Sequence, residues 1–240
     1  INEIRKIAKR KKIALIEDAA ESIGSKINNK NIGTFGELAI FSFAGNKILT
    51  SGEGGAIVTN SKEKFEKLKL IRSHGRKTKG NYFSSIQSPN YIELGYNWRM
   101  SSITAALCLA QLKKIEKLID ARRKNAKYYQ NKLEKINEIR IHEEPDGYRH
   151  VYQLYSICLP SKMIRNKLSK FLAKKGIMSK VFFDPIHNSK HFKNHKLEKN
   201  EMTNTKKISE CVLSLPMYPE LTKNDIDEIV NAISEFFEQK

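Results

Sequence analysis

One stretch limits what this chain can fold into: residues 35–60, FGELAIFSFAGNKILTSGEGGAIVTN. The run Leu38–Phe43 predicts an apolar strand, and the β-branched run Ala56–Thr59 predicts a second one. Between them, small residues and glycines predict sharp turns around a single lysine, Lys47. A lysine in this position is either the exposed end of a loop or an amine placed to react with a carbonyl group.

A second apolar segment, Ile13–Ser22 (IALIEDAAES), ends in acidic residues. Open α/β sheets bind ligands beyond the carboxyl ends of their strands, so Asp18 is a candidate to hold a proton on a heteroaromatic nitrogen. Ser42, on the strand that leads to Lys47, is a candidate phosphate ligand. Pyridoxal phosphate needs an amine, a carboxylate and a phosphate-binding hydroxyl, because its ring withdraws electrons well only while its nitrogen stays protonated.

Several segments resemble blocks of the DegT/DnrJ/EryC1/StrS family of nucleotide-sugar aminotransferases. They are IEDAAESIGS, GTFGELAIFSFAGNKILTSGEGGAIVT, LGYNWRMSSITAALCLAQL and VLSLPMYPELT, in the family's order. The resemblance implies the α/β architecture of fold-type-I aminotransferases, with a mostly parallel sheet. It assigns residues 1–120 to part of the large cofactor-binding domain and residues 121–240 to a small α+β domain. Family members carry a further N-terminal portion, so the resemblance implies a chain shortened at its front.

The resemblance also implies roles for individual residues. Lys47 matches the lysine that binds pyridoxal phosphate covalently, and Asp18 matches the partner of the ring nitrogen. Ser42 matches the phosphate-binding serine, and Glu21 falls where family members place a polar residue near the ring hydroxyl. The expected cofactor is therefore pyridoxal 5′-phosphate.

Two further segments are implicated by the same resemblance. In LGYNWRM, Asn97 is expected to reach the cofactor of a partner subunit, and Arg99 is expected to bind substrate. The alternative is that this segment packs through its aromatic residues and that Arg99 forms a surface ion pair. His187 matches a histidine that follows a proline in the small domain, near the substrate entrance.

The resemblance implies transfer of an amino group from glutamate to the 3- or 4-keto group of a nucleotide-linked deoxysugar. Such a reaction belongs to surface-polysaccharide or glycan biosynthesis, in a cytoplasmic homodimer with shared active sites. Relatives that dehydrate sugars carry histidine at the position of Lys47, so the lysine favours transamination. Two alternatives stay open: an inactive remnant or piece of a split protein, and a basic binding module without catalysis.

The net charge of the chain bears on the alternative of a basic binding module. Lysine and arginine number 44 against 26 acidic residues, giving a net charge of +18 and a pI near 9.7. This balance is typical of nucleic-acid binders. However, the lysines are spread along the chain, and no known nucleic-acid-binding motif stands out, so we interpret the excess as a solvated surface that could attract a diphosphate. No apolar window approaches the length of a membrane span.

Cysteines and histidines could form other kinds of site. Cys108, Cys158 and Cys211 lie far apart, with no CxxC motif, which argues against a disulfide framework and suits a reducing cytosol. His187, His191 and His195 recur at every fourth position and would share one face of a helix able to bind zinc. The proline and polar residues around them favour a loop, so no metal site is predicted.

Hydrophobic periodicity and capping residues predict the remaining elements. Helices are expected over 2–12, 62–74 and 101–133, from Ser161 to Lys175, and from Thr222 onward, with Asp225 completing a capping box. Strands are expected over 13–16, 151–159, 178–183 and 211–215. Asn28-Asn29 predicts a hairpin tip, and residues 76–91 predict a long loop.

Overall fold

The structure is a computed structural model that describes residues 1–77, 90–193 and 202–239. Contacts divide the chain into two compact units. The first unit contains residues 1–116 and 147–149, and the second contains residues 117–146 and 150–240. The domain boundary predicted between residues 120 and 121 stays a prediction.

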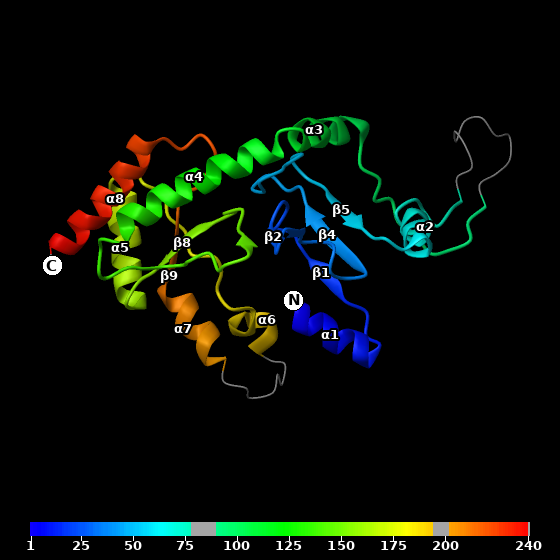
Figure 1. The fold of residues 1–240 in the computed structure, drawn as a ribbon, viewed down its shortest axis with the longest axis horizontal. Coiled ribbons are helices and arrows are strands. Elements are labelled where there is room, and N and C mark those ends of the chain that lie inside the picture. The colour runs from blue at the N-terminus through cyan, green and yellow to red at the C-terminus, as the bar shows by residue number, and fades with distance from the viewer. Residues whose placement is uncertain (78–89, 194–201, 240) are drawn as a thin grey trace. The chain divides into compact units, whose positions relative to one another are not determined.

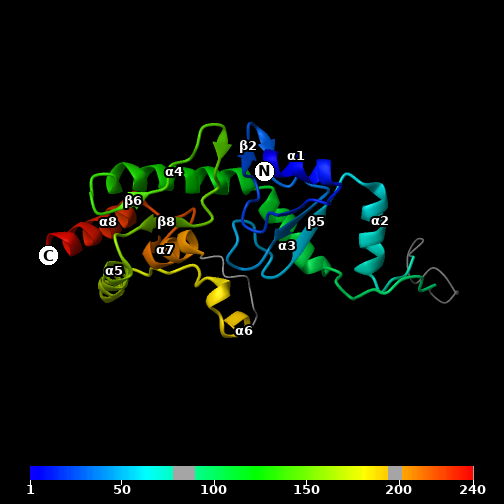
Figure 2. The ribbon, with the colours of Figure 1, turned by 90° about the horizontal axis from the view of Figure 1, so that it is seen from below.

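A three-stranded sheet organises the first unit (Figures 1 and 2). Its strands are β1 (Ile16–Asp18), β4 (Leu38–Ser42) and β5 (Gly55–Val58), in the order β1-β4-β5. β1 pairs with β4 in parallel, and β4 pairs with β5 in antiparallel. The sheet places the carboxyl ends of β1 and β4 at one edge.

The first strand differs from its predicted bounds. We expected a strand over 13–16, whereas β1 begins at Ile16 and includes both carboxylates, Glu17 and Asp18. The reason is its partner: β4 begins opposite Ile16, at Leu38, and the carbonyl of Leu15 instead accepts the N–H of Glu37 at 2.8 Å. The preceding helix α1 (Asn2–Lys11) agrees with the prediction.

The first unit also contains a short hairpin and the helix α2. β2 (Lys26–Ile27) and β3 (Lys30–Asn31) meet at Asn28 and Asn29, which take φ angles of 47° and 64°. Asparagine tolerates this left-handed conformation, so the predicted hairpin tip is confirmed. β7 (Tyr148–Arg149) adds to β2 in antiparallel. α2 (Lys62–Ile71) ends earlier than predicted, before the left-handed His74.

The long helix predicted over 101–133 is wrong in one respect, because it is two helices. α3 (Ser102–Leu112) and α4 (Ile115–Leu133) are separated by a turn at Lys113 and Lys114. There, the N–H of Lys114 donates to the carbonyl of Gln111 at 2.9 Å, a bond between residues three apart that is typical of a 3₁₀ turn. The apolar residues keep their helical spacing from α3 into α4, so the sequence pattern gave no sign of the break.

The second unit packs helices on a three-stranded antiparallel sheet. The strands, in spatial order, are β6 (Arg140–Ile141), β8 (Tyr155–Cys158) and β9 (Val212–Leu215). Its described helices are α4, of which residues 117–133 belong to this unit, and α5 (Lys162–Lys174), η2 (Ile186–Asn188), α6 (Lys190–Lys193), α7 (Thr203–Cys211) and α8 (Lys223–Glu238). α5 and α8 pack against each other (Figures 1 and 2).

Two predicted strands of the second unit need correction. β8 is shorter than the predicted strand over 151–159, because Tyr152 adopts a φ of 50°, which no strand residue takes. The segment 178–183 is not a strand and forms only an isolated bridge between Lys180 and Ser214. Cys211 ends α7, so β9 begins at Val212.

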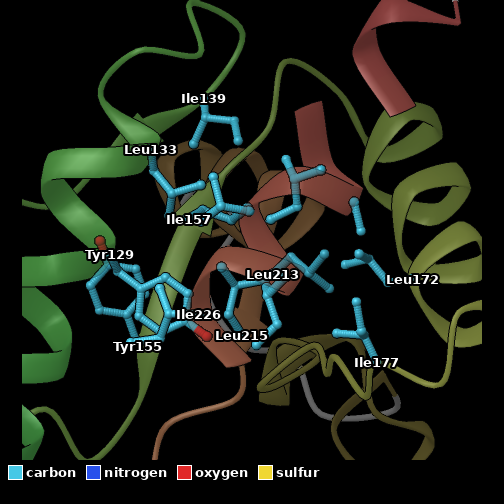
Figure 3. Close-up of a cluster of buried hydrophobic side chains, with 14 of the residues drawn as sticks. Tyr129, Leu133, Ile139, Tyr155, Ile157, Leu172, Ile177, Leu213, Leu215 and Ile226 are labelled. Atoms are coloured by element: carbon cyan, nitrogen blue, oxygen red, sulfur yellow. The ribbon is translucent and has the colours of Figure 1, made fainter. Parts of the chain in front are cut away.

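The core of the second unit lies between its sheet and helices (Figure 3). Alternation along 151–159 is confirmed, since the odd-numbered residues are buried and the even-numbered ones are not. The Tyr129 and Tyr155 rings stack at 4.8 Å, and burial raises the pKa of both phenols. The predicted caps are also confirmed: Ser161 begins α5, and Thr222 with Asp225 forms the capping box of α8.

In the ranges 1–77, 90–193 and 202–239, the helices are all too short or too polar to cross a membrane.

Candidate active site

Lys47 is held at a tight turn directly after β4. Its N–H bonds to the carbonyl of Ala44 at 3.0 Å, which closes the turn. The two residues that follow, Ile48 and Leu49, are buried and anchor the chain below it. The N–H of Phe43 donates to the carbonyl of Gly54 at 2.9 Å, and the carbonyl of Phe43 accepts the N–H of Ser51 at 3.0 Å. The glycine-rich segment therefore folds back against the end of β4. This packing fixes where the lysine side chain starts.

Asp18 and Ser42 lie on the same face of the sheet. Asp18 ends β1 and pairs in parallel register with Ile40 of β4, so both side chains project to one side. Ser42 follows Ile40 by one full alternation and therefore projects to that side too. Asp18 is exposed, and its Oδ1 accepts the N–H of Ala20 at 3.1 Å. The face has a carboxylate and a hydroxyl on neighbouring strand ends.

Glu21 connects Lys47 to this edge. The Nζ of Lys47 lies 2.7 Å from Oε1 of Glu21, which sits in the turn that follows Asp18. The lysine side chain is 13% exposed, whereas that of Glu21 is 45% exposed. A long cationic side chain this well covered is unusual for lysine, which normally stays solvated. The ion pair therefore brings the amine to the end of the strand that carries Asp18.

Glu17, the other carboxylate of β1, has a structural position that we did not predict. It is buried, and its oxygens accept the N–H groups of Gly33 (2.8 Å), Phe35 (2.6 Å) and Gly36 (2.6 Å). Any side chain at Gly36 would collide with the carbonyl of Leu15, 2.6 Å from the Cβ position. Strand alternation is the signal that could have found this role, because only one of two adjacent carboxylates can face a ligand.

Asn97 and Arg99 contact each other in the first unit. The Nε of Arg99 donates to Oδ1 of Asn97 at 3.2 Å, and both residues are exposed. Asn97 forms a bridge with Ser73, and the rings of Tyr96 and Trp98 stack at 4.3 Å. Both rings are nevertheless exposed, so they stack on each other without being buried, and the roles of Asn97 and Arg99 stay predictions.

His187 and His191 belong to the second unit. His187 lies on η2 and is partly buried, and its Nε2 is buried without a hydrogen-bond partner among the described residues. His191 lies on the separate helix α6, because Ser189 between them is extended. His195 lies outside the described residues. Within the described residues, no group of three potential metal ligands occurs.

Comparison with known proteins decides the family. The sequence matches the DegT/DnrJ/EryC1/StrS aminotransferase family over residues 1–234. This chain belongs to that family. Members of the DegT/DnrJ/EryC1/StrS family are aminotransferases that depend on pyridoxal phosphate.

Individual relatives in the family are similar over the whole chain. A GDP-perosamine synthase from Vibrio cholerae is 34% identical over 239 residues, covering 99% of this chain and 63% of the relative. A UDP-4-amino-4,6-dideoxy-N-acetyl-beta-L-altrosamine transaminase from Campylobacter jejuni is 31% identical, covering 100% of this chain and 62% of the relative. The chain therefore spans about three fifths of the length of these family members.

A solved structure in the family shows the same architecture. Helicobacter pylori PseC, an aminotransferase involved in the biosynthesis of pseudoaminic acid, superposes with a TM-score of 0.91 at 27% identity. The match covers 100% of this chain and 63% of PseC. The fold is that of the fold-type-I aminotransferases, as predicted.

The residues present fit the cofactor of the DegT/DnrJ/EryC1/StrS family. An amine, a carboxylate and a hydroxyl are the groups that pyridoxal phosphate needs for its aldehyde, its ring nitrogen and its phosphate. Lys47, Asp18 and Ser42 supply one of each, and the contact with Glu21 ties the amine to the Asp18 strand end.

Proposed function

We propose that this chain provides the lysine-bearing cofactor site of an aminotransferase that acts on a nucleotide-linked keto sugar, with glutamate as the amino donor. Family membership supports the reaction class. The single observation that carries the site assignment is the 2.7 Å contact between Lys47 Nζ and Glu21 Oε1, since it joins the amine to the strand end that carries Asp18.

Asp18, Ser42 and Glu21 each have one proposed role. Asp18 holds the proton on the ring nitrogen, because an exposed carboxylate at a strand end can accept an N–H bond from a ring lying over the sheet. Ser42 donates its hydroxyl to the phosphate from the same face. Glu21 accepts a hydrogen bond from the Lys47 amine and holds it at that edge. Pyridoxal phosphate, when bound, supplies the electron-withdrawing ring that stabilises negative charge at the donor's α-carbon.

Lys47 has two proposed roles, because it binds the cofactor and then acts as the base. Its Nζ takes the proton from the α-carbon of glutamate, and in the second half of the reaction it returns a proton to the carbon that gains the amine. The tight turn at Ala44 and the buried Ile48 limit how far the side chain can swing, so the amine stays near the reacting carbon.

Two relatives support the proposed substrate class. One is named for a GDP-linked sugar and the other for a UDP-linked sugar, so a nucleoside diphosphate is the part that both sugars carry. A diphosphate is drawn toward a cationic protein, and this chain has a net charge of +18. We therefore propose a nucleoside diphosphate sugar without choosing the base.

A homodimer with shared sites is part of the proposal. α3 lies wholly within the described residues, and none of its residues is buried. Ile103 is 86% exposed and Leu109 60% exposed on this helix, and Trp98, just before it, is 66% exposed. Apolar surface of this kind is typical of an interface. A second copy covering it would bring its Asn97 and Arg99 with it.

The donor half of the reaction tests the function. Chain loaded with pyridoxal phosphate is mixed with glutamate, and 2-oxoglutarate is measured in a single turnover. We expect the unchanged chain to produce it, Asp18→Asn to slow its release by roughly 10²-fold or more, and Lys47→Arg to abolish it. Lys30→Arg is the control, since Lys30 is an exposed lysine of the same unit.

The outcomes separate the alternatives. Equal rates for the unchanged chain and Lys47→Arg would contradict the assignment of the base. Cofactor bound through Lys47 without any 2-oxoglutarate would show a folded but inactive relative. Absence of cofactor binding together with salt-sensitive binding to nucleic acid would replace the proposal with the basic binding module.

A further inference from the structure

Cys158 and Cys211, far apart in the sequence, are neighbours in the second unit. Cys158 is the last residue of β8, and Cys211 is the last residue of α7, directly before β9. The register of the β8–β9 ladder places Cys158 opposite Val212. The N–H of Leu159 donates to the carbonyl of Cys211 at 2.9 Å, so the backbones are joined where the cysteines lie. Spacing alone could not show this pair.

The side chains of Cys158 and Cys211 therefore start from adjoining backbone positions. Burial, first of all, and the neighbouring Cys158 thiol raise the pKa of Cys211. The Nη2 of Arg140 lies 3.8 Å from Sγ of Cys158, so a guanidinium lies next to this sulfur. Cys158 therefore lies between a second thiol and a cation.

The two cysteines are intermediate in exposure. Both cysteines are free, and neither residue is fully buried. Cys108, which lies on α3 in the first unit, is also free and partly buried. This third cysteine serves as an internal comparison of similar exposure.

We propose that Cys158 and Cys211 form a dithiol site that a low-molecular-weight disulfide oxidises to an intramolecular disulfide. The Cys158 thiolate attacks one sulfur of the reagent, forming a mixed disulfide and releasing one thiol. Cys211 then gives up its proton to solvent, its sulfur attacks Sγ of Cys158, and the second reagent thiol leaves. The two protein sulfurs are oxidised, and one reagent disulfide is reduced to two thiols.

The bond would close the chain segment from residue 158 to residue 211. This segment contains α5, η2 with His187, α6 and α7. A crosslink that closes a long segment restricts the unfolded chain, so the oxidised protein resists denaturation better than the reduced one.

Alkylation after treatment with glutathione disulfide tests the proposal. Denatured protein is alkylated, and its mass and peptides are analysed. We expect two of the three cysteines to escape alkylation, a crosslinked peptide pair containing Cys158 and Cys211, and Cys108 still alkylated. Dithiothreitol should restore all three thiols, and the urea midpoint should be higher for the oxidised form.

Conservative variants keep the result interpretable. Cys211→Ser should stop at a stable glutathione adduct on Cys158, whereas Cys108→Ser should crosslink as the unchanged chain does. Full alkylation of all three cysteines after treatment would overturn the proposal. Stable glutathione adducts on the unchanged chain, without any crosslink, would overturn it equally.

Discussion

Replacing Glu17 by glutamine should weaken the first unit without altering the second. The carboxylate is buried and accepts three backbone N–H bonds, two at Oε1 and one at Oε2. Glutamine has nearly the same shape, but its amide group can supply only one acceptor oxygen. If that oxygen keeps the bonds from Phe35 and Gly36, an NH₂ group faces the N–H of Gly33.

The magnitude follows from these contacts. A hydrogen bond to a charged group contributes about 1.5–3 kcal/mol, and a buried donor without a partner costs a further ~1–3 kcal/mol. Partial relaxation of the turn lowers the total, so we expect Glu17→Gln to destabilise the first unit by about 2–4 kcal/mol. A cost of this size is a large fraction of the stability of a typical domain.

Amide hydrogen exchange measured by NMR separates the two units. We expect faster exchange at Gly33 and Gly36 in Glu17→Gln, and unchanged exchange in β8 of the second unit. Glu53→Gln is the matched control, because Glu53 is an exposed glutamate of the same unit, and it should change stability by no more than ~0.5 kcal/mol. Unchanged protection of the Gly33 and Gly36 amides in Glu17→Gln would show that the carboxylate does not stabilise this turn.

Three further predictions concern the second unit. Leu213→Ala removes a fully buried side chain and should destabilise this unit by about 2–5 kcal/mol in urea denaturation followed by circular dichroism. Arg122→Ala removes a buried guanidinium whose Nη1 donates to the carbonyls of residues 152, 153 and 217, and should cost about 3 kcal/mol in the same assay. Hydrogen bonds from the Thr222 hydroxyl and backbone lower the pKa of Asp225 from its ordinary value of 3.8, so the folded state favours the ionised carboxylate. The carboxylate of Asp225 therefore stabilises the folded state fully above its unfolded pKa, and this stabilisation is lost as the pH falls through its folded pKa. The difference in melting temperature between the unchanged chain and Asp225→Ala should accordingly shrink on acidification below about pH 4. A difference in melting temperature that is constant from pH 7 to pH 3 would contradict this role of Asp225, and stabilities of Leu213→Ala or Arg122→Ala equal to that of the unchanged chain would contradict the packing and hydrogen-bond arguments.

Much of the fold could be predicted where local chemistry decides the structure. Serine and threonine at Ser161 and Thr222 accept backbone N–H bonds at helix starts, and Asn28 with Asn29 takes the left-handed backbone of a tight turn. Such signals depend on neighbouring residues only. They were sufficient to place these ends correctly.

Other features depend on distant partners and could not be predicted. The start of β1 is set by where β4 begins, and the segment 178–183 fails to become a strand because only Lys180 pairs with β9. The break between α3 and α4 leaves the apolar spacing intact, so periodicity could not detect it.

The candidate site divides in the same way. The types of residue at Asp18, Ser42 and Lys47 predict a pyridoxal phosphate site from the sequence alone, because each supplies a different functional group. The ion pair between Lys47 and Glu21 and the buried role of Glu17 are long-range contacts, and they required the structure.

The proposed function requires the Lys47 amine to bind the cofactor. The most direct measurement is borohydride reduction of the chain loaded with pyridoxal phosphate, followed by peptide mapping. We expect a stable cofactor label on the peptide that contains Lys47, and no label at that position in Lys47→Arg. A label on a different lysine, or a well-folded sample that takes up no label at all, would contradict it.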